Sequence, residues 1–249
     1  MEALAGFTAL QIGVALVTTL VGAFVRGLAG FGLAILLVPV LALALTPVQA
    51  VLVTNLVALL VGLSELRSIL ANAERSALVI GGLVFVTTAP GMAALAATPP
   101  DVARFLIALV ALSAFFVILL PQRAADRPGA VTTGLAGISS GLLTGFAGMP
   151  GPPVVPYYVG RAIPRQTAKA SMLLIFTIAA LAGTGSGAVI GRLEGKLLWL
   201  ALLLFPAVLV GNWLGSRAFG KVSDQVWRGF VALVLAVTAM AALVKLWAG

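Results

Sequence analysis

Long apolar stretches fill almost the whole chain of 249 residues. An α-helix rises 1.5 Å per residue, so about 20 apolar residues cross a hydrocarbon core about 30 Å thick. The connections are too short for a soluble domain, so we expect an all-α polytopic membrane protein. The sequence predicts ten hydrophobic segments, at residues 6–25, 28–45, 47–63, 77–97, 102–120, 130–146, 150–160, 165–190, 197–215 and 225–247.

The composition excludes several classes of protein. Hydrophobic residues make up 61% of the chain and charged residues 9%, whereas an ordinary soluble domain has about 25% charged residues. The chain has no Cys and no His, which excludes disulfides, thiolate nucleophiles and typical zinc or haem sites. We therefore expect no enzyme, no metal and no cofactor. The net charge is +8, but the chain has no soluble basic domain that could bind nucleic acid, so we expect no nucleic-acid partner.

Glycine and proline interrupt two of the ten segments. The segment 28–45 opens inside the run Gly-Leu-Ala-Gly-Phe-Gly at 27–32 and carries Pro39. The segment 150–160 follows a Gly/Pro-rich run at 145–153 and covers only about half a bilayer. Interrupted helices free backbone polar groups that lipid cannot satisfy. Such breaks must be buried in protein or line a wet cavity, so we expect them near the midplane.

The two interrupted segments correspond to each other. Residues 28–30 match residues 146–148 at a spacing of 118. Four rarer residues, Pro39, Pro47, Gln49 and Thr54, match Pro156, Pro164, Gln166 and Ser171 at a spacing of 117. We interpret the chain as a duplication, with repeat 1 at 1–121, a connecting loop at 122–129 and repeat 2 at 130–249.

The distribution of charge predicts how the repeats are oriented. If all ten segments cross, or if both broken ones re-enter, each half contains an odd number of crossings. Ten Lys and Arg residues then lie on one side and four on the other, and the richer side of a membrane protein faces the cytoplasm. We therefore expect inverted repeats of five segments each. The loops Ser64–Ser76 and Pro121–Gly129 are then cytoplasmic, and both termini are periplasmic.

Inverted repeats with discontinuous helices are typical of secondary transporters. A helix that starts inside the membrane presents free N–H groups and the positive end of its dipole, and two such starts form an anion site. Glycine is needed there because it lets a ligand approach the backbone. The candidate glycines are Gly27, Gly30 and Gly32 in the first half and Gly145, Gly148 and Gly151 in the second.

Four side chains near the breaks are further candidates for binding an anion. Thr54, Asn55 and Ser171 offer hydroxyl or amide donors, although such residues also form hydrogen bonds between helices. Arg26 stands directly before the first glycine, and an Arg inside a membrane segment indicates function unless it extends to the interface.

The sequence around the breaks resembles the sulfite exporter TauE/SafE family of permeases. The resemblance lies in the Gly-rich break followed by Val38-Pro39, the run Pro47–Ala50 and the pair Thr54-Asn55. The second copy, Gly145–Gly148 through Val155-Pro156 and Ala170-Ser171, is similar to that family's repeat. It departs from the family at 149–153, which is richer in proline than the expected glycine run.

The resemblance implies a bacterial inner-membrane carrier of sulfite, sulfonates or related organosulfur anions. The partners expected are a small anionic substrate, the lipid bilayer and, as one option, further copies of the chain. An anion channel and a membrane subunit that needs a partner are the alternatives. No acidic residue lies in the middle of a segment, so we predict export driven by the membrane potential alone, at about 2.3 kcal/mol per charge per 100 mV.

Overall fold

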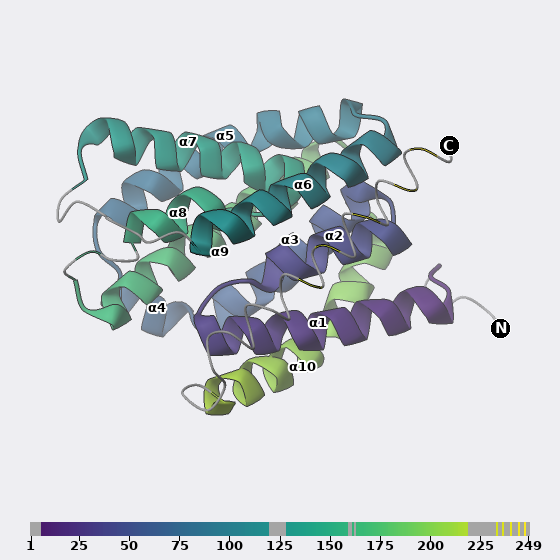
Figure 1. The fold of residues 1–249 in the computed structure, drawn as a ribbon, viewed down its shortest axis with the longest axis horizontal. Helices are drawn as coiled ribbons and strands as arrows, with labels where there is room; N and C mark the ends of the chain where they lie inside the picture. The colour runs from purple at the N-terminus through teal and green to yellow at the C-terminus, as the bar shows by residue number, and fades with distance from the viewer. Residues whose placement is uncertain are drawn as a thin grey trace.

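The computed structural model describes residues 6–119, 128–158, 161 and 163–218, and single positions at 233, 236, 240, 244 and 247. Its regular elements are α-helices, as the sequence predicts (Figure 1). Within the described ranges the helices are α1 (Ala9–Ala29), α2 (Leu33–Ala44), α3 (Pro47–Ser64), α4 (Leu66–Asn72), α5 (Ser76–Ala97), α6 (Pro100–Leu119), α7 (Ala130–Ala147), α8 (Gly151–Tyr158), α9 (Arg165–Val189) and α10 (Gly195–Ala218).

Six helices among the described residues are long and apolar enough to cross a membrane. They are α1, α3, α5, α7, α9 and α10. An all-helical chain with several apolar spans is confirmed, and the number of ten segments stays a prediction. Most of the predicted segment 225–247 and most of the connecting loop 122–129 lie outside the described residues.

The segment Ser64–Ser76 corrects one prediction. We expected a loop there, but Leu66–Asn72 forms α4, which packs against α9. Ile69 is its buried anchor and joins the apolar cluster that contains Tyr158 and Ile175. A search for spans about 20 residues long overlooks a helix of two turns that buries one side chain.

Left-handed glycines end two of the long helices. α1 continues to Ala29, where Gly30 has φ 84° and its N–H donates to the Arg26 carbonyl at 2.7 Å. α7 continues to Ala147 and ends at Gly148, with φ 66°. Only glycine adopts this conformation without steric cost, so it is the residue that stops a helix in this way. The first break therefore lies at 30–32, three residues later than the first glycine of the run, and the second at 148–150.

Apart from those at the two breaks, the helix ends described below lie in two groups at opposite ends of the bundle. At the first end, the Arg26 guanidinium of α1 bonds Glu65 after α3 and Asn212 of α10. At the second end, Gln11 near the start of α1 donates to the Ala44 carbonyl at the end of α2. α7 starts at the first end, because Thr133 bonds Tyr157 of α8, whose neighbour Tyr158 bonds Ser76 at the start of α5. α1 and α7 therefore run in opposite directions.

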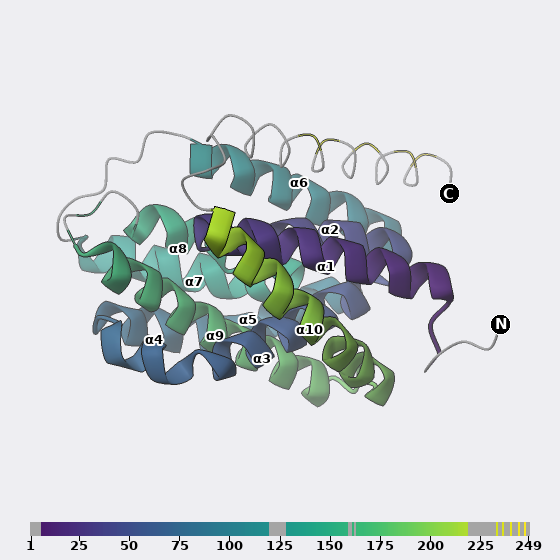
Figure 2. The ribbon, with the colours of Figure 1, turned by 90° about the horizontal axis from the view of Figure 1, so that it is seen from below.

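Glycines allow two pairs of helices to pack closely. α5 packs along α7, and α10 packs against α1 and crosses it at an angle (Figures 1 and 2). A Cβ at Gly145 of α7 would lie 2.1 Å from the Thr88 carbonyl oxygen, and a Cβ at Gly215 of α10 would lie 2.0 Å from the Phe24 carbonyl oxygen. Small residues let helix backbones approach in this way inside a membrane. α3 and α9, the most buried of the six spans, pack against each other.

Candidate functional site

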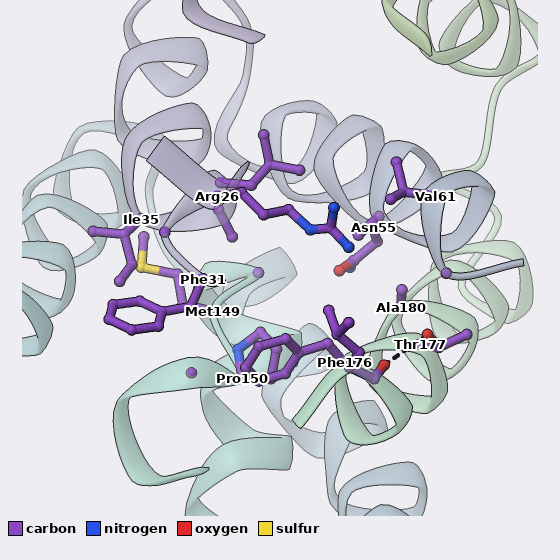
Figure 3. A pocket seen from close by; sticks show the side chains of 18 of the residues that line it. Arg26, Phe31, Ile35, Asn55, Val61, Met149, Pro150, Phe176, Thr177 and Ala180 are labelled. Carbon is purple, nitrogen blue, oxygen red and sulfur yellow. Dashed lines mark hydrogen bonds between the residues drawn. The ribbon is translucent and has the colours of Figure 1, made fainter. Parts of the chain in front are cut away.

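A pocket lies where the two helix breaks meet the paired helices α3 and α9 (Figure 3). The empty space between its lining residues is about 730 Å³, a volume that includes the part open to solvent. Its walls are mainly apolar. The lining residues are Arg26 of α1; Gly30–Ile35 of the first break and the start of α2; Asn55, Ala58, Val61 and Gly62 of α3; Gly148–Gly151 of the second break; and Leu173, Phe176, Thr177 and Ala180 of α9.

The beginnings of two helices form part of the wall. α2 starts after Gly32, which has φ 109° and provides no side-chain cap for the first turn. The N–H groups of Leu33, Ala34 and Ile35 therefore have no partner within the helix, and these residues line the pocket. α8 begins at Gly151, which lines the same pocket. Two helix N-termini thus border one cavity, and their dipoles favour negative charge in it. The backbone donors come mainly from α2, because Pro152 and Pro153 of α8 have no N–H group.

Arg26 is the charged residue of the lining. Its side chain is only 11% exposed, and Figure 3 shows its guanidinium beside the Asn55 amide. The guanidinium donates to both Glu65 carboxylate oxygens, from Nη2 to Oε2 at 3.0 Å and from Nη1 to Oε1 at 3.4 Å. Nη1 also donates to Asn212 Oδ1 at 3.1 Å. The pocket therefore holds a cation that is already paired by groups outside the lining.

Asn55 lines the pocket and carries an amide donor without a partner. The residue is 2% exposed, and its Nδ2 has no hydrogen-bond partner among the described residues. This Nδ2 lies beside Gly183 of α9, where an added Cβ would meet it, and a buried donor without a partner costs free energy. On the other helix, Thr177 also lines the pocket, but its hydroxyl donates to the Leu173 carbonyl at 2.7 Å.

The structure brings six of the ten predicted site residues to the pocket. They come from both halves of the chain: Arg26, Gly30, Gly32, Asn55, Gly148 and Gly151. The other four are not among the lining residues. They are Gly27, Thr54, Gly145 and Ser171.

Gly27 and Gly145 are positions of close helix packing. A Cβ at Gly27 would lie 2.3 Å from the Asn212 carbonyl oxygen of α10, and Gly145 meets Thr88 of α5 in the same way. Thr54 and Ser171 are both buried. Ser171 Oγ accepts from the Glu74 N–H at 2.9 Å, and Thr54 Oγ1 is buried without a partner.

Sequence reasoning missed the wall that α9 contributes. Its pocket residues are spaced by three and four, which places them on one face of the helix. The same spacing relates Asn55, Ala58 and Gly62 on α3 and explains why Thr54, one residue before Asn55, does not face the pocket. The spacing of three and four residues along each helix was the signal that could have identified these residues. On α9 the face is composed of Leu173, Phe176, Thr177 and Ala180.

The residues that pair with Arg26 were also missed. Glu65 and Asn212 lie 39 and 186 positions from it in the chain. Among the described residues, no group of three or more His, Cys, Asp or Glu side chains is placed to hold a metal ion. The polar side chains of the lining are therefore Arg26, Asn55 and Thr177, and backbone donors of the first turn of α2 stand beside them.

Almost the whole chain, including every residue of the pocket, matches one family. Residues 14–242 match the family described as sulfite exporter TauE/SafE. The chain belongs to the sulfite exporter TauE/SafE family. The resemblance found in the sequence is confirmed, and this multi-pass membrane protein belongs to a family of exporters.

A curated relative carries a related name. The probable sulfite/organosulfonate exporter TauE of Cupriavidus necator is 28% identical over 99 residues. That match covers 40% of this chain and 39% of the relative, so the chain spans about two fifths of the relative's length in the match. No solved structure matches the chain.

Proposed function

We propose that the chain is a secondary transporter that exports small sulfur-containing anions, such as sulfite or a sulfonate, across the bacterial inner membrane. The observation that carries the proposal is the pocket between the two breaks. Two helix N-termini, one buried guanidinium and one unpartnered amide converge there within apolar walls. Helix N-termini and Arg are the groups that bind tetrahedral oxyanions, and the apolar walls suit the organic part of a sulfonate.

We infer that the protein consists of two inverted repeats. Three features support this: α1 and α7 run in opposite directions, each ends at a left-handed glycine, and each is followed by a short helix with an internal proline, Pro39 in α2 and Pro156 in α8. Each of the two closely packed helix pairs joins one helix of the first half to one helix of the second half: α1 packs on α10, and α5 packs on α7. The segment 225–247 completes the second repeat in this proposal.

The orientation follows from the charges at the two ends of the bundle. The end that holds α4 carries Arg67, Arg75 and Arg217, whereas Arg104 and Lys196 lie at the other end beside Asp101 and Glu194. The end with more unneutralised positive charge faces the cytoplasm. The bundle end where α1 starts is then periplasmic, and both termini lie on that side.

Transport by the purified protein in liposomes tests this function. Vesicles preloaded with one anion of a panel (sulfite, sulfate, thiosulfate, taurine, sulfoacetate) are diluted into a trace of the same labelled anion. A carrier gives saturable counterflow, a channel gives flux without counterflow, and a subunit that needs a partner gives neither. Export driven by potential alone predicts that the flux follows an imposed potassium diffusion potential and ignores a pH gradient.

A variant of the first break provides a site-specific control. Gly30→Leu adds bulk at the pocket wall, and we expect it to abolish counterflow while the protein still inserts into the membrane. Gly191→Leu is the matched control, because Gly191 also has a left-handed φ of 69°, is exposed, does not line the pocket and has nothing within 4 Å of its added Cβ. Normal counterflow in Gly30→Leu would mean that the break serves packing alone.

A further inference from the structure

The cation of the pocket has two different kinds of neighbour. On one side, Arg26 faces the cavity and the Asn55 amide. On the other side, its guanidinium bonds both oxygens of Glu65, which does not line the pocket and is 32% exposed. In the absence of a ligand the charge of Arg26 is therefore balanced by a carboxylate of the chain itself.

An anion in the pocket competes with Glu65 for the guanidinium of Arg26. A second negative group near Arg26 is repelled by the Glu65 carboxylate, and the apolar walls strengthen that repulsion. The guanidinium has five N–H donors in a fixed plane, and a carboxylate or an oxyanion engages two of them side by side. Glu65 uses one N–H of each terminal nitrogen and Asn212 uses a second one on Nη1, so an anion on the remaining donors shares the charge of the guanidinium with Glu65. Its negative charge repels the Glu65 carboxylate and weakens the Arg26–Glu65 pair.

The pair also connects separate parts of the bundle. Arg26 belongs to α1, Glu65 lies at the junction of α3 and α4, and Asn212 belongs to α10. Gly27, next to Arg26, packs directly on the backbone of Asn212, so α1 and α10 are held together by other contacts as well. The Glu65 bond is therefore the polar link from this helix pair to the α3–α4 junction among the described residues.

We propose that Glu65 is an internal competitor for Arg26, which the transported anion displaces, and that this exchange releases α1 from the α3–α4 junction. Glu65 is a positioning residue in this scheme, because it acts on the anion through Arg26. The inference rests on the proposed function. It adds how binding of the anion in the pocket changes the contact between α1 and the α3–α4 junction.

A second ion pair at the same end of the bundle offers a matched control. Arg161 bonds Glu74 at 2.6 Å, and its guanidinium lies 5.5 Å and 5.6 Å from the ring centres of Tyr157 and Tyr158. Neither Arg161 nor Glu74 lines the pocket. Glu74→Gln therefore removes a comparable carboxylate without changing the competition for Arg26.

Calorimetric titration with sulfoacetate and with sulfite tests the competition. Glu65→Gln keeps the shape of the side chain and removes the charge, so we expect Kd to fall about tenfold. Counterflow turnover at saturating anion should fall, because the returning carboxylate no longer helps to expel the anion. Glu74→Gln should leave Kd within twofold of the unmodified chain. An unchanged or higher Kd in Glu65→Gln would overturn the inference.

A distance measurement tests the release without relying on that variant. The chain has no Cys, so spin labels attach only at Leu20→Cys on α1 and Leu70→Cys on α4, which are both exposed positions. Pulsed electron resonance should show a longer or broader distance distribution after addition of sulfoacetate, and Glu65→Gln should show it without the anion. A distribution unaffected by saturating sulfoacetate would overturn the release.

The two proposals fail in distinguishable ways. An unmodified chain that binds and transports neither anion overturns the proposed function and this inference together. An unmodified chain that transports, with a Glu65→Gln variant that binds no more tightly, overturns the inference alone.

Discussion

The α1–α2 break and the α7–α8 break share their backbone design. Each begins at a left-handed glycine, Gly30 or Gly148, and each leads into a short helix with an internal proline. They differ in the residue one turn before the glycine. At the first break this residue is Arg26, whose guanidinium reaches the pocket. At the second it is Thr144, whose hydroxyl bonds the Ser140 carbonyl of its own helix at 2.7 Å.

The surroundings of the two breaks differ as well. Space is open around an added Cβ at Gly30, whereas at Gly148 that Cβ would lie 3.0 Å from Val38 Cγ2. The second break is also held by Ser140, which donates to the Pro150 carbonyl at 2.7 Å. The two breaks therefore have similar backbones and different contributions to the pocket. The first break brings a positive charge to it, and the second forms a closely packed part of its wall.

The largest effect should come from removing that charge. Arg26→Gln should lower transport efficiency about 100-fold, or about 2.7 kcal/mol, because the anion loses the cationic partner in an apolar pocket. Thr144→Val at the corresponding place should change it less than threefold. Initial rates of anion counterflow measure both. Equal losses in the two variants would contradict the different contributions of the two breaks.

The next effect concerns packing rather than binding. Gly145→Ala should destabilise the protein by about 2 kcal/mol, because the added Cβ meets the backbone of Thr88 on α5. Gly134→Ala on the same helix has nothing within 4 Å and should leave stability unchanged or slightly higher. Size-exclusion profiles after heating in detergent measure the difference. If Gly145→Ala left stability unchanged, Gly145 would not be a packing position and would again be a candidate for anion binding.

A smaller effect tests whether Asn55 is a ligand. Asn55→Leu should weaken transport about tenfold, yet it should not lower thermal stability, because the removed Nδ2 donor has no partner in the free protein. Met172, which follows Asn55 by the repeat spacing of 117, is buried on α9 but does not line the pocket. Met172→Leu should therefore leave transport unchanged. Reduced stability in Asn55→Leu would indicate a structural amide instead.

The smallest effect compares the two glycines directly. Gly30→Ala and Gly148→Ala both place a Cβ at positive φ, which costs about 1–2 kcal/mol. Gly148→Ala should cost about 0.5 kcal/mol more, because its Cβ also presses on Val38. Melting temperatures of the two purified variants check the order. A more damaging Gly30→Ala would mean that the first break is the more rigid one.

Much of the fold is predictable because it depends on local properties of the chain. Apolar length predicts the spans, and glycine and proline predict the two breaks to within a few residues. The helix α4 was missed because a single buried Ile69 holds it, and its packing partners lie on other helices. Of the candidate side chains, Asn55 faces the pocket and Thr54 does not, since neighbours on a helix point about 100° apart.

The sequence by itself determined that this protein is a bundle of apolar helices with two interruptions, and that glycines and an Arg stand at them. Those features follow from hydrophobic length and backbone conformation, which act over a few residues. Only the tertiary structure decided that α9 closes the pocket and that Glu65 and Asn212 hold Arg26. These partners are far apart in the chain, and their meeting depends on how whole helices rotate and pack against one another.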